Sequence, residues 1–283
     1  MYSDLLGELT GTAAGTFSVR RADGSVVDVP AEDVHRLRAV PPGAADILAL
    51  EEVAAQGWPA ARTARIGGWL LRSSEGWTRR ANSCLLLGDP GMPVEDALAA
   101  VRDWYAGHGR PAILSVPLPA QSPADRVAER LGWAVDVRTD VLTAPLDSLV
   151  RPAPEVTVSA ELTPEWEAVY QAKTVPPVGR QILTAPEVVG FASIGSGAAG
   201  TVAIGRGVVV ADWLGVAAVE VVPGHRRQGL AARIMAGLAA WGWERGARRC
   251  YLQVEETNAP AHALYHRLGF ERHHRYLNRV APG

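Results

Sequence analysis

The sequence predicts an α/β protein that begins with a small β module, and three observations support this prediction. Strand-like and helix-like segments alternate through the C-terminal half, which is typical of a layered α/β architecture. A weaker copy of the same pattern lies upstream, in the first half of the chain. An Asp-Gly pair between two strand-like runs near the N-terminus marks a hairpin. The 283 residues are enough for about two domains, at roughly 100–200 residues each.

Composition and charge exclude several classes of protein. Apolar residues make up 48% of the chain, and the net charge is −2, which argues against a disordered chain and against a surface built for nucleic acid. The two cysteines, Cys84 and Cys250, lack the spacing of a disulfide framework or a zinc site. The first residues are acidic, unlike a signal peptide. The uncharged stretch 188–205 is broken by glycines, which indicates two strands around a turn at 196–200 rather than a membrane helix. We therefore expect a cytoplasmic protein with neither a membrane nor a nucleic-acid partner.

The first element is the small β module of residues 1–42. Strand-like runs at 17–20 and 26–29 flank the turn Ala22-Asp23-Gly24-Ser25, and Asp-Gly favours a tight hairpin. Prolines at 41 and 42 then end the module. The pattern resembles an SH3-like mini-barrel.

The remaining chain contains an internal repeat. When the chain is aligned with itself so that Trp104 matches Trp241, the stretch 130–133 (Arg-Leu-Gly-Trp) matches 267–270 (Arg-Leu-Gly-Phe) without a gap. We call this displacement the repeat offset. The alternative is a chance similarity of two helix ends, because glycine commonly caps a helix. The repeat divides the chain into halves at 44–147 and 150–283.

The second half is expected to alternate strands and helices. We expect a strand at 216–222, a helix at 229–245, a strand at 250–254, a helix at 259–268 and a strand at 272–280.

The loop between the first of these strands and its helix is a candidate anion site. The strand ends at Pro223, and a basic loop with Gly229 leads into the helix. Such a loop directs backbone N–H groups and the positive end of the helix dipole at one point, where a pyrophosphate can bind. Gly229 would let the backbone approach the phosphates closely. The alternative is an ordinary turn with solvated arginines. The apolar face expected for the helix consists of Leu230, Ile234, Leu238 and Trp241.

Two motifs in this half resemble those of the GNAT superfamily of N-acetyltransferases. The pyrophosphate motif Arg/Gln-x-x-Gly-x-Gly/Ala is matched by Arg226, Gly229 and Ala231. The resemblance covers about residues 150–283, and it implies a mixed sheet splayed open between the two motifs, with acetyl-CoA as co-substrate in the splay. The later motif is matched by Asn258, Ala261, Leu264, Tyr265, Gly269 and Phe270.

The resemblance also implies roles for individual residues. Tyr265 would be the general acid that protonates the departing CoA thiolate, and a backbone N–H near Val221 would contact the oxyanion. Asn258 would contact the cofactor arm, and it also stands where a helix N-cap belongs. The pantetheine would bind along the strand, and the pyrophosphate would bind in the loop. The implied cofactor-binding residues are Val219, Val221, Arg226, Arg227, Gln228, Gly229, Leu230, Ala231, Ala232 and Asn258.

The general base is less clear, because Gln253 and Gly215 stand where many members of the superfamily have a glutamate. An amide cannot take a proton at neutral pH. Our first candidate is Glu255, which shares a strand face with Gln253, and Glu256 and Glu220 remain open. An amine of low pKa, or deprotonation through water, would need no dedicated base.

Two histidines add a further candidate site. His262 and His266 share a helix face, but no carboxylate or thiol in the pattern completes a metal site, so we predict none.

The first half is predicted to be a degenerate GNAT-like copy that does not bind CoA. An acidic loop repels a pyrophosphate, and methionine lacks the backbone freedom of glycine. Tandem members of the superfamily likewise pair an inactive half with an active one. At the repeat offset, the positions of Arg226, Gly229, Asn258 and Tyr265 are occupied by Asp89, Met92, Gln121 and Ala128.

We therefore predict an acetyl-CoA-dependent N-acetyltransferase that acetylates an amine on a small molecule or a protein. The alternative, kept open by Gln253, is an acyl-CoA-binding or regulatory module without catalytic activity. A first helix is expected near 164–172, with a substrate loop after it at 175–181, and a homodimer is compatible with the sequence. The first half is a candidate wall of the acceptor pocket, although its tryptophans also suit an interdomain core. The residues that suggest this wall are Trp58, Trp69, Trp77, Arg79 and Arg80.

Overall fold

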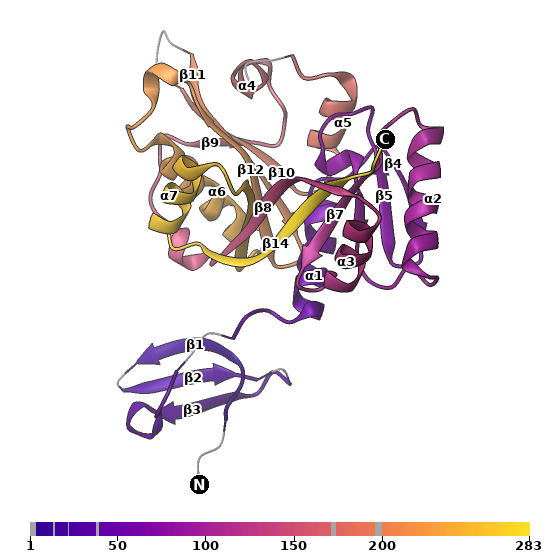
Figure 1. The fold of residues 1–283 in the computed structure, drawn as a ribbon. Coiled ribbons are helices and arrows are strands. Elements are labelled where there is room, and N and C mark those ends of the chain that lie inside the picture. Colours follow the sequence, from indigo (N-terminus) through magenta and orange to yellow (C-terminus); the bar gives the residue numbers. More distant parts are fainter. Residues whose placement is uncertain (1–3, 14, 22, 38–39, 171–173, 196–199) are drawn as a thin grey trace. The chain divides into compact units, whose positions relative to one another are not determined.

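The computed structural model describes residues 4–13, 15–21, 23–37, 40–170, 174–195 and 200–283 (Figure 1). The chain forms two compact units, Met1–Pro41 and Pro42–Gly283. In the described ranges, no helix is both long and apolar enough to cross a membrane. The turn expected at 196–200 lies almost entirely outside the described residues, as do residues 171–173.

The first unit is a three-stranded antiparallel sheet in the order β1-β2-β3. Gly24 has a φ of +83°, and the Asp23 carboxylate accepts a hydrogen bond from the Ser25 N–H at 2.9 Å. The predicted hairpin is therefore confirmed, although Ala22 of its turn is not among the described residues. Strand β1 was not predicted, and the likeness to an SH3 barrel remains a prediction. The strands are β1 (Glu8–Ala13), β2 (Thr16–Arg20) and β3 (Val26–Pro30).

The described part of the second unit contains one sheet of 11 strands (Figure 1). Its order is β4-β5-β6-β7-β14-β8-β13-β12-β11-β10-β9. The strands are β4 (Arg62–Ile66), β5 (Trp69–Ser73), β6 (Cys84–Leu86), β7 (Ile113–Leu118), β8 (Ala134–Pro145), β9 (Thr157–Ser159), β10 (Val189–Gly195), β11 (Thr201–Val210), β12 (Trp213–Val221), β13 (Arg249–Glu255) and β14 (Glu271–Val280).

Helices cover both faces of this sheet. Leu214 and Cys250 pack in the cluster of α6, whereas their neighbours Trp213 and Tyr251 pack against α1, as the period of two along a strand requires. We call these two sides the α6 face and the α1 face. Helices α4 and α5 also lie on the α1 face. The helices are α1 (Ala44–Gly57), α2 (Val94–Gly107), α3 (Ser122–Arg130), α4 (Pro164–Val169), α5 (Pro177–Thr184), α6 (Leu230–Glu244) and α7 (Ala259–Arg267).

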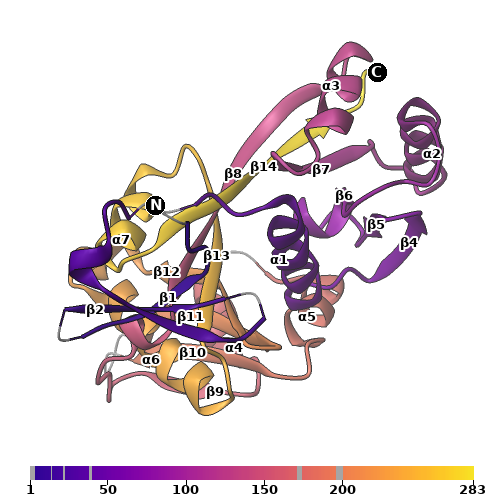
Figure 2. The same cartoon turned by 90° about the horizontal axis from the view of Figure 1, so that it is seen from below.

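The last strands of the two halves are exchanged at the centre of the sheet. Strand β14 of the second half lies between β7 and β8, and β8 of the first half lies between β14 and β13 (Figure 2). Thr139 pairs with Tyr276, its own counterpart at the repeat offset. Helices α3 and α7 begin and end at positions related by the same offset. The two copies found in the sequence are therefore related by a pseudo-twofold axis that passes between β8 and β14.

The strands and helices expected in the second half are confirmed within a few residues at each end. The first half follows the same order, but β6 has only three residues. The repeat offset holds most closely from α2 to β8. The assignment of separate roles to the two halves remains a prediction.

Arg279 fastens the exchanged strand β14 to the first half. Its Nε donates to Asp125 Oδ1 of α3 at 2.6 Å, and its Nη1 donates to the Trp133 carbonyl at 2.7 Å. The Arg279 side chain is 5% exposed. Loss of such a charged donor leaves the Asp125 carboxylate without its hydrogen-bond donor.

We predict that Arg279→Met lowers the free energy of unfolding by about 1.5–3 kcal/mol. The matched control is Arg272→Met on the same strand, because Arg272 is 58% exposed and lies 3.9 Å from Asp140. That change should cost less than about 0.5 kcal/mol. Urea unfolding measures both, and equal losses would contradict the anchoring role of Arg279.

Candidate active site

The centre of the second half is a gap between two parallel strands. The paired residues of β12 and β13 end at Val216 and Leu252, although the strands continue to Val221 and Glu255. Strand β13 stays paired on its other side with β8 as far as Glu255. The splay predicted between the two motifs is therefore confirmed.

A β-bulge in β12 determines which side chains face each side of this splay. Ala218, with a φ of +54°, and Val219 lie opposite the single residue Gly205 of β11. One extra residue reverses the faces of all that follow. Val219 and Val221 therefore pack on the α6 face. Glu220 lies on the other side, where burial and then the charge of Glu220 raise the pKa of Tyr170.

The bulge was not predicted. Its sequence signal is the spacing of three residues between Val216 and Val219, which breaks the period of two along the strand.

The loop after β12 has the form of an anion site. A 3₁₀ turn at Pro223–His225 leads to Arg227, which has a φ of +65°, and to Gly229. No side chain caps α6, so the first N–H groups of the helix have no partner within it. Residues 226–229 are exposed. The predicted apolar face is confirmed, because all of its members are buried, namely Leu230, Ile234, Leu238 and Trp241.

The reason for Gly229 differs from our expectation. Its φ is +77°, and a Cβ added there would meet no atom within 4 Å. Glycine is therefore required by the left-handed backbone rather than by crowding.

The Asn258 motif forms the start of α7. The Asn258 Oδ1 accepts a hydrogen bond from the Ala261 N–H at 3.2 Å, which confirms the predicted N-cap. Tyr265 is half-buried, and its ring packs edge-on against Phe270 at 5.7 Å. Burial raises the pKa of Tyr265 to about 12. The phenol is therefore protonated at neutral pH and holds a proton that it can donate.

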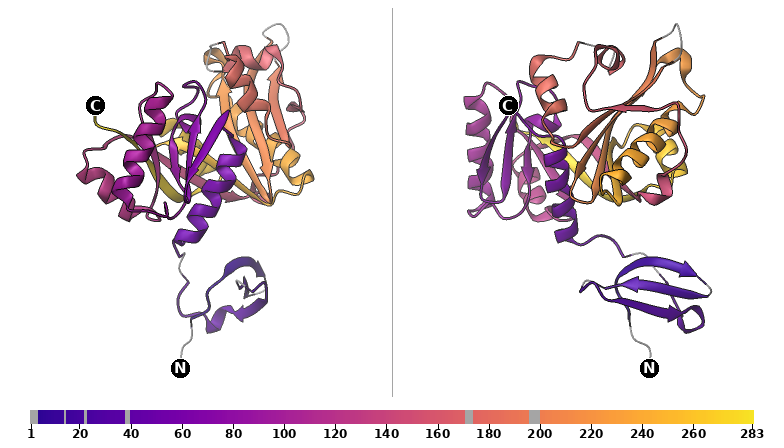
Figure 3. Two further views of the ribbon diagram at one scale, coloured as in Figure 1. Left: turned by 90° about the vertical axis from the view of Figure 1, so that its right-hand side faces the viewer. Right: turned by 180° about the vertical axis from the view of Figure 1, so that it is seen from behind.

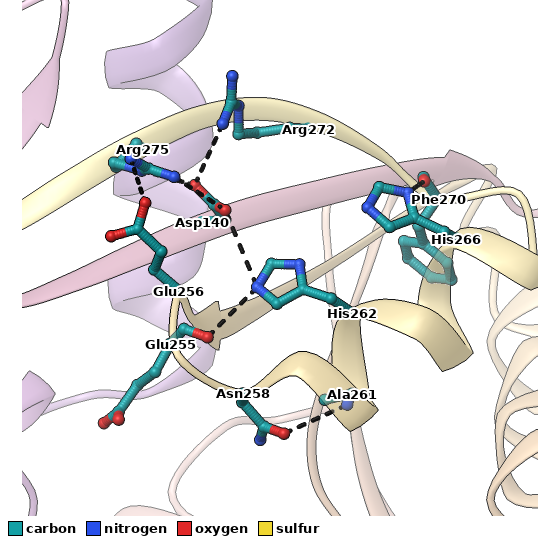
Figure 4. Close-up of polar contacts among 10 residues, drawn as sticks. All are labelled: Asp140, Glu255, Glu256, Asn258, Ala261, His262, His266, Phe270, Arg272 and Arg275. Carbon is teal, nitrogen blue, oxygen red and sulfur yellow. Dashed lines mark hydrogen bonds and ion pairs between the residues drawn. The ribbon is translucent and has the colours of Figure 1, made fainter.

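The three candidate carboxylates lie in different surroundings. Glu255 is exposed at the end of β13, and its side chain points away from His262 (Figure 4). Glu256 forms an ion pair with Arg275 at 2.7 Å. Glu220 alone of the three lies on β12, beyond the bulge. The structure therefore brings Glu220, but not Glu256, to the α1 face of the splay.

A carboxylate of the first half lies beside α7. Asp140 of β8 is 5% exposed and accepts two hydrogen bonds from Arg275, at 2.8 and 3.2 Å. The same carboxylate lies 3.9 Å from the His262 Nε2 (Figure 4). His262 and His266 stack at 6.1 Å. Among the described residues, no group of three His, Cys, Asp or Glu could hold a metal ion.

The corresponding loop of the first half is bound to its own sheet. The Gly88 carbonyl accepts hydrogen bonds from Trp69 Nε1 at 3.0 Å and from Gln121 Nε2 at 3.3 Å. The Gly68 N–H donates to the Asp89 carbonyl at 2.7 Å. Ala128, the counterpart of Tyr265, is fully buried. Gln121 therefore binds the loop of its own half, whereas its counterpart Asn258 caps α7.

The α1 face carries an aromatic cluster drawn from both halves. Trp58 stacks on Trp77 at 5.7 Å, and both belong to the cluster that includes Trp166 of α4. Trp69 instead lies in the core of the first half. The tryptophans expected at the acceptor pocket are therefore divided between a wall on the α1 face and a separate core.

The segment expected as a substrate loop at 175–181 is largely helical. Helix α5 runs from Pro177 to Thr184, and Val178 and Ile182 are buried. Their spacing of four residues presents one apolar face, and proline is favoured at the first helical position. The expectation of a loop at 175–181 was therefore wrong.

Comparison with known proteins identifies the family. A family model described as "Probable histone acetyltransferase Rv0428c C-terminal" matches residues 44–279. The chain belongs to this family. It is an N-acetyltransferase of the GNAT superfamily.

A relative and two solved structures agree with this membership. The probable histone acetyltransferase Rv0428c of Mycobacterium tuberculosis (strain ATCC 25618 / H37Rv) is 30% identical over 282 residues, which cover 95% of this chain and 86% of that protein. A GCN5-related N-acetyltransferase from Kribbella flavida shares the fold with a TM-score of 0.66 and 22% identity, covering 84% of this chain and 96% of that one. A tandem GNAT protein from the clavulanic acid biosynthesis pathway has a TM-score of 0.58 and 18% identity, covering 88% and 91%.

We predict that Gly229→Ala lowers the free energy of unfolding by about 1–2 kcal/mol, because alanine resists the left-handed backbone. Gly224→Ala in the same loop is the control, since its φ is not positive and its Cβ would also meet no atom within 4 Å. Urea unfolding should show no loss for the control beyond about 0.5 kcal/mol. A similar loss in both variants would refute the conformational explanation.

Proposed function

We propose that this acetyltransferase takes its acetyl group from acetyl-CoA and transfers it to an amine. The observation that carries the proposal is the splay between β12 and β13, which runs from the uncapped start of α6 to the last strand pair at Val216 and Leu252. A long arm with a diphosphate at one end suits such a gap. The thioester would then lie at the closed end of the splay.

The proposed cofactor site uses backbone groups more than side chains. Val219 and Val221 would bind the pantetheine as a neighbouring strand does, and Asn258 would contact it from α7. The loop from Arg226 to Ala232 would hold the diphosphate through N–H groups and two guanidiniums. The corresponding loop of the first half is hydrogen-bonded to its own half, which supports one cofactor per chain.

In the proposed reaction the amine nitrogen attacks the thioester carbonyl carbon, and the C–S bond then breaks. The oxyanion needs an N–H donor, which β12 would supply beyond its bulge. Tyr265 would give its proton to the departing thiolate. The proton that the amine loses would go to Glu220.

Glu220 is the proposed base because the bulge turns its side chain to the α1 face. The acetyl-CoA would enter the splay from the loop that precedes α6. The amine would therefore approach the thioester from the α1 face. Glu255 lies further along the splay, and Glu256 already neutralises Arg275.

We predict that Tyr265→Phe lowers kcat by about 100-fold or more, as loss of a general acid does. Calorimetry should still find one acetyl-CoA bound per chain with an unchanged affinity. Deprotonation of Tyr265 should not lower the wild-type kcat between about pH 7 and about pH 10, because a pKa of about 12 keeps the phenol protonated there. Unchanged turnover in the variant would remove Tyr265 from the reaction. Two acetyl-CoA molecules per chain would show that the first half also binds.

We expect Glu220→Gln to lower kcat by about 100-fold at neutral pH, as loss of a general base does. Glu255→Gln and Glu256→Gln are matched controls in the same region, and each should retain kcat within about threefold. A loss confined to Glu255→Gln would make Glu255 the base. If no amine released CoA beyond background hydrolysis while acetyl-CoA still bound, the chain would be a binding module.

A further inference from the structure

Four buried side-chain atoms without a hydrogen-bond partner border one cavity on the α1 face. Five such atoms occur in the described part of the chain, so four of the five lie at this one cavity. Three are donors and one is an acceptor. They are Trp58 Nε1, Arg80 Nε, Arg206 Nη2 and Gln253 Oε1.

The cavity lies where the splay closes. Its walls include Ala217 of β12 and Gln253 of β13, the residues that immediately follow the last strand pair. Gly57 and Trp58, at the end of α1, close it from the first half. Helix α1, purple in both views of Figure 3, lies against β11 and β12 of the second half. A substrate in this cavity would therefore meet a thioester that enters along the splay from the opposite end.

Two guanidiniums line the cavity, and the first of them belongs to Arg206. Arg206 is 2% exposed, and among the described residues it donates to the carbonyls of Leu183 and Gly57, at 2.9 and 3.1 Å. Its Nη2 has no partner. Burial lowers the pKa of Arg206 to about 10, so it is still charged at neutral pH.

Arg80 adds a second guanidinium beside the first. Arg80 and Arg206 both lie over the Trp58 ring, with 5.3 and 5.1 Å from each guanidinium carbon to the ring centroid. Neither forms an ion pair within the described ranges of the chain. Arg206 is buried and Arg80 is half-buried, and a buried cation is costly unless an anion joins it.

Gln253 places a hydrogen-bond acceptor, rather than a donor, at the cavity. Its Oε1 is a buried acceptor that lacks a donor, and it lies on the strand that borders the splay. An amine N–H would satisfy this oxygen, while the guanidinium forks would hold a carboxylate.

We propose that the acceptor is a small amine that itself carries a carboxylate, with the carboxylate bound by Arg80 and Arg206 and the amine held by Gln253. This inference rests on the proposed function and names its substrate class. Both guanidiniums lie over the Trp58 ring, and their forks match a carboxylate through paired hydrogen bonds. A lysine side chain in a protein lacks an anion near its amine and would leave both arginines unmatched.

The first experiment compares amino acids with their carboxamides and their decarboxylated amines, using CoA release as the readout. The carboxylate form should have a kcat/KM about 10- to 100-fold higher than either neutral partner, as expected for hydrogen bonds between charged groups. Aminophosphonates and a basic histone-like peptide complete the panel. A preference for either of these, or equal rates throughout, would overturn the proposal and leave N-acetyl transfer intact.

The second experiment uses Arg80→Met, because Arg206 also holds the ends of α1 and α5. The variant should raise KM for the amino acid about 10- to 100-fold, while KM for acetyl-CoA and the rate with the carboxamide change less than about threefold. Arg79→Met is the matched control, since Arg79 is exposed and paired with Asp136 at 3.0 Å. Equal effects of the two variants would overturn the assignment.

A binding measurement separates this proposal from the proposed function. Calorimetry with CoA present should show that the amino acid binds the wild-type chain and Arg79→Met, but binds Arg80→Met about 10- to 100-fold more weakly. This result supports the carboxylate site even if no acetyl transfer occurs. Absence of binding to the wild type, together with turnover of neutral amines, would overturn the site and retain the reaction.

Discussion

The exchange of β8 and β14 is the constraint on which the other features of the second unit depend. Strand β13 is paired along its whole length with β8, whereas its pairing with β12 stops at Leu252. The first half therefore supplies the strand that keeps β13 in the sheet while β12 diverges from it. The gap proposed for the cofactor could not be open in this form if the second half stood alone, because β13 would be left without a partner over Gln253–Glu255.

The same exchange places charged side chains of the first half on both sides of the splay. Near α7, Asp140 of the first half joins Arg275 and lies close to His262. On the α1 face, Arg80 of the first half approaches Arg206. The first half thus acts on the candidate site through a carboxylate on one side and a guanidinium on the other.

Local signals in the sequence predicted much of the fold. Helix α7 and its N-cap Asn258 were evident, because capping and apolar spacing depend on neighbouring residues. The repeat offset correctly related α3 to α7. The exchange itself was hidden, since both copies have the same pattern and a strand does not specify which copy it pairs with. Helix α5 was missed because its prolines and glycine suggested a loop.

The candidate site was predictable only in part, for a related physical reason. The loop at 226–232 and Tyr265 lie in continuous motifs, and these motifs carried the prediction. The cavity is formed by Trp58, Arg80, Arg206 and Gln253, which are far apart in the sequence. Only the fold brings them together, and the bulge at Ala218 depends on the register with β11.

The pseudo-twofold axis between Thr139 and Tyr276 also bears on how such a chain can diverge. Two separate identical chains that exchanged their last strands would form a symmetric dimer, in which every substitution alters both sites at once. Here the two copies are joined, so each position can change independently. One loop has kept Arg226 and Gly229, while the other has Asp89 and Met92. Joining the copies thus allows one of two equivalent sites to lose ligand binding and its surface to shape the pocket of the other.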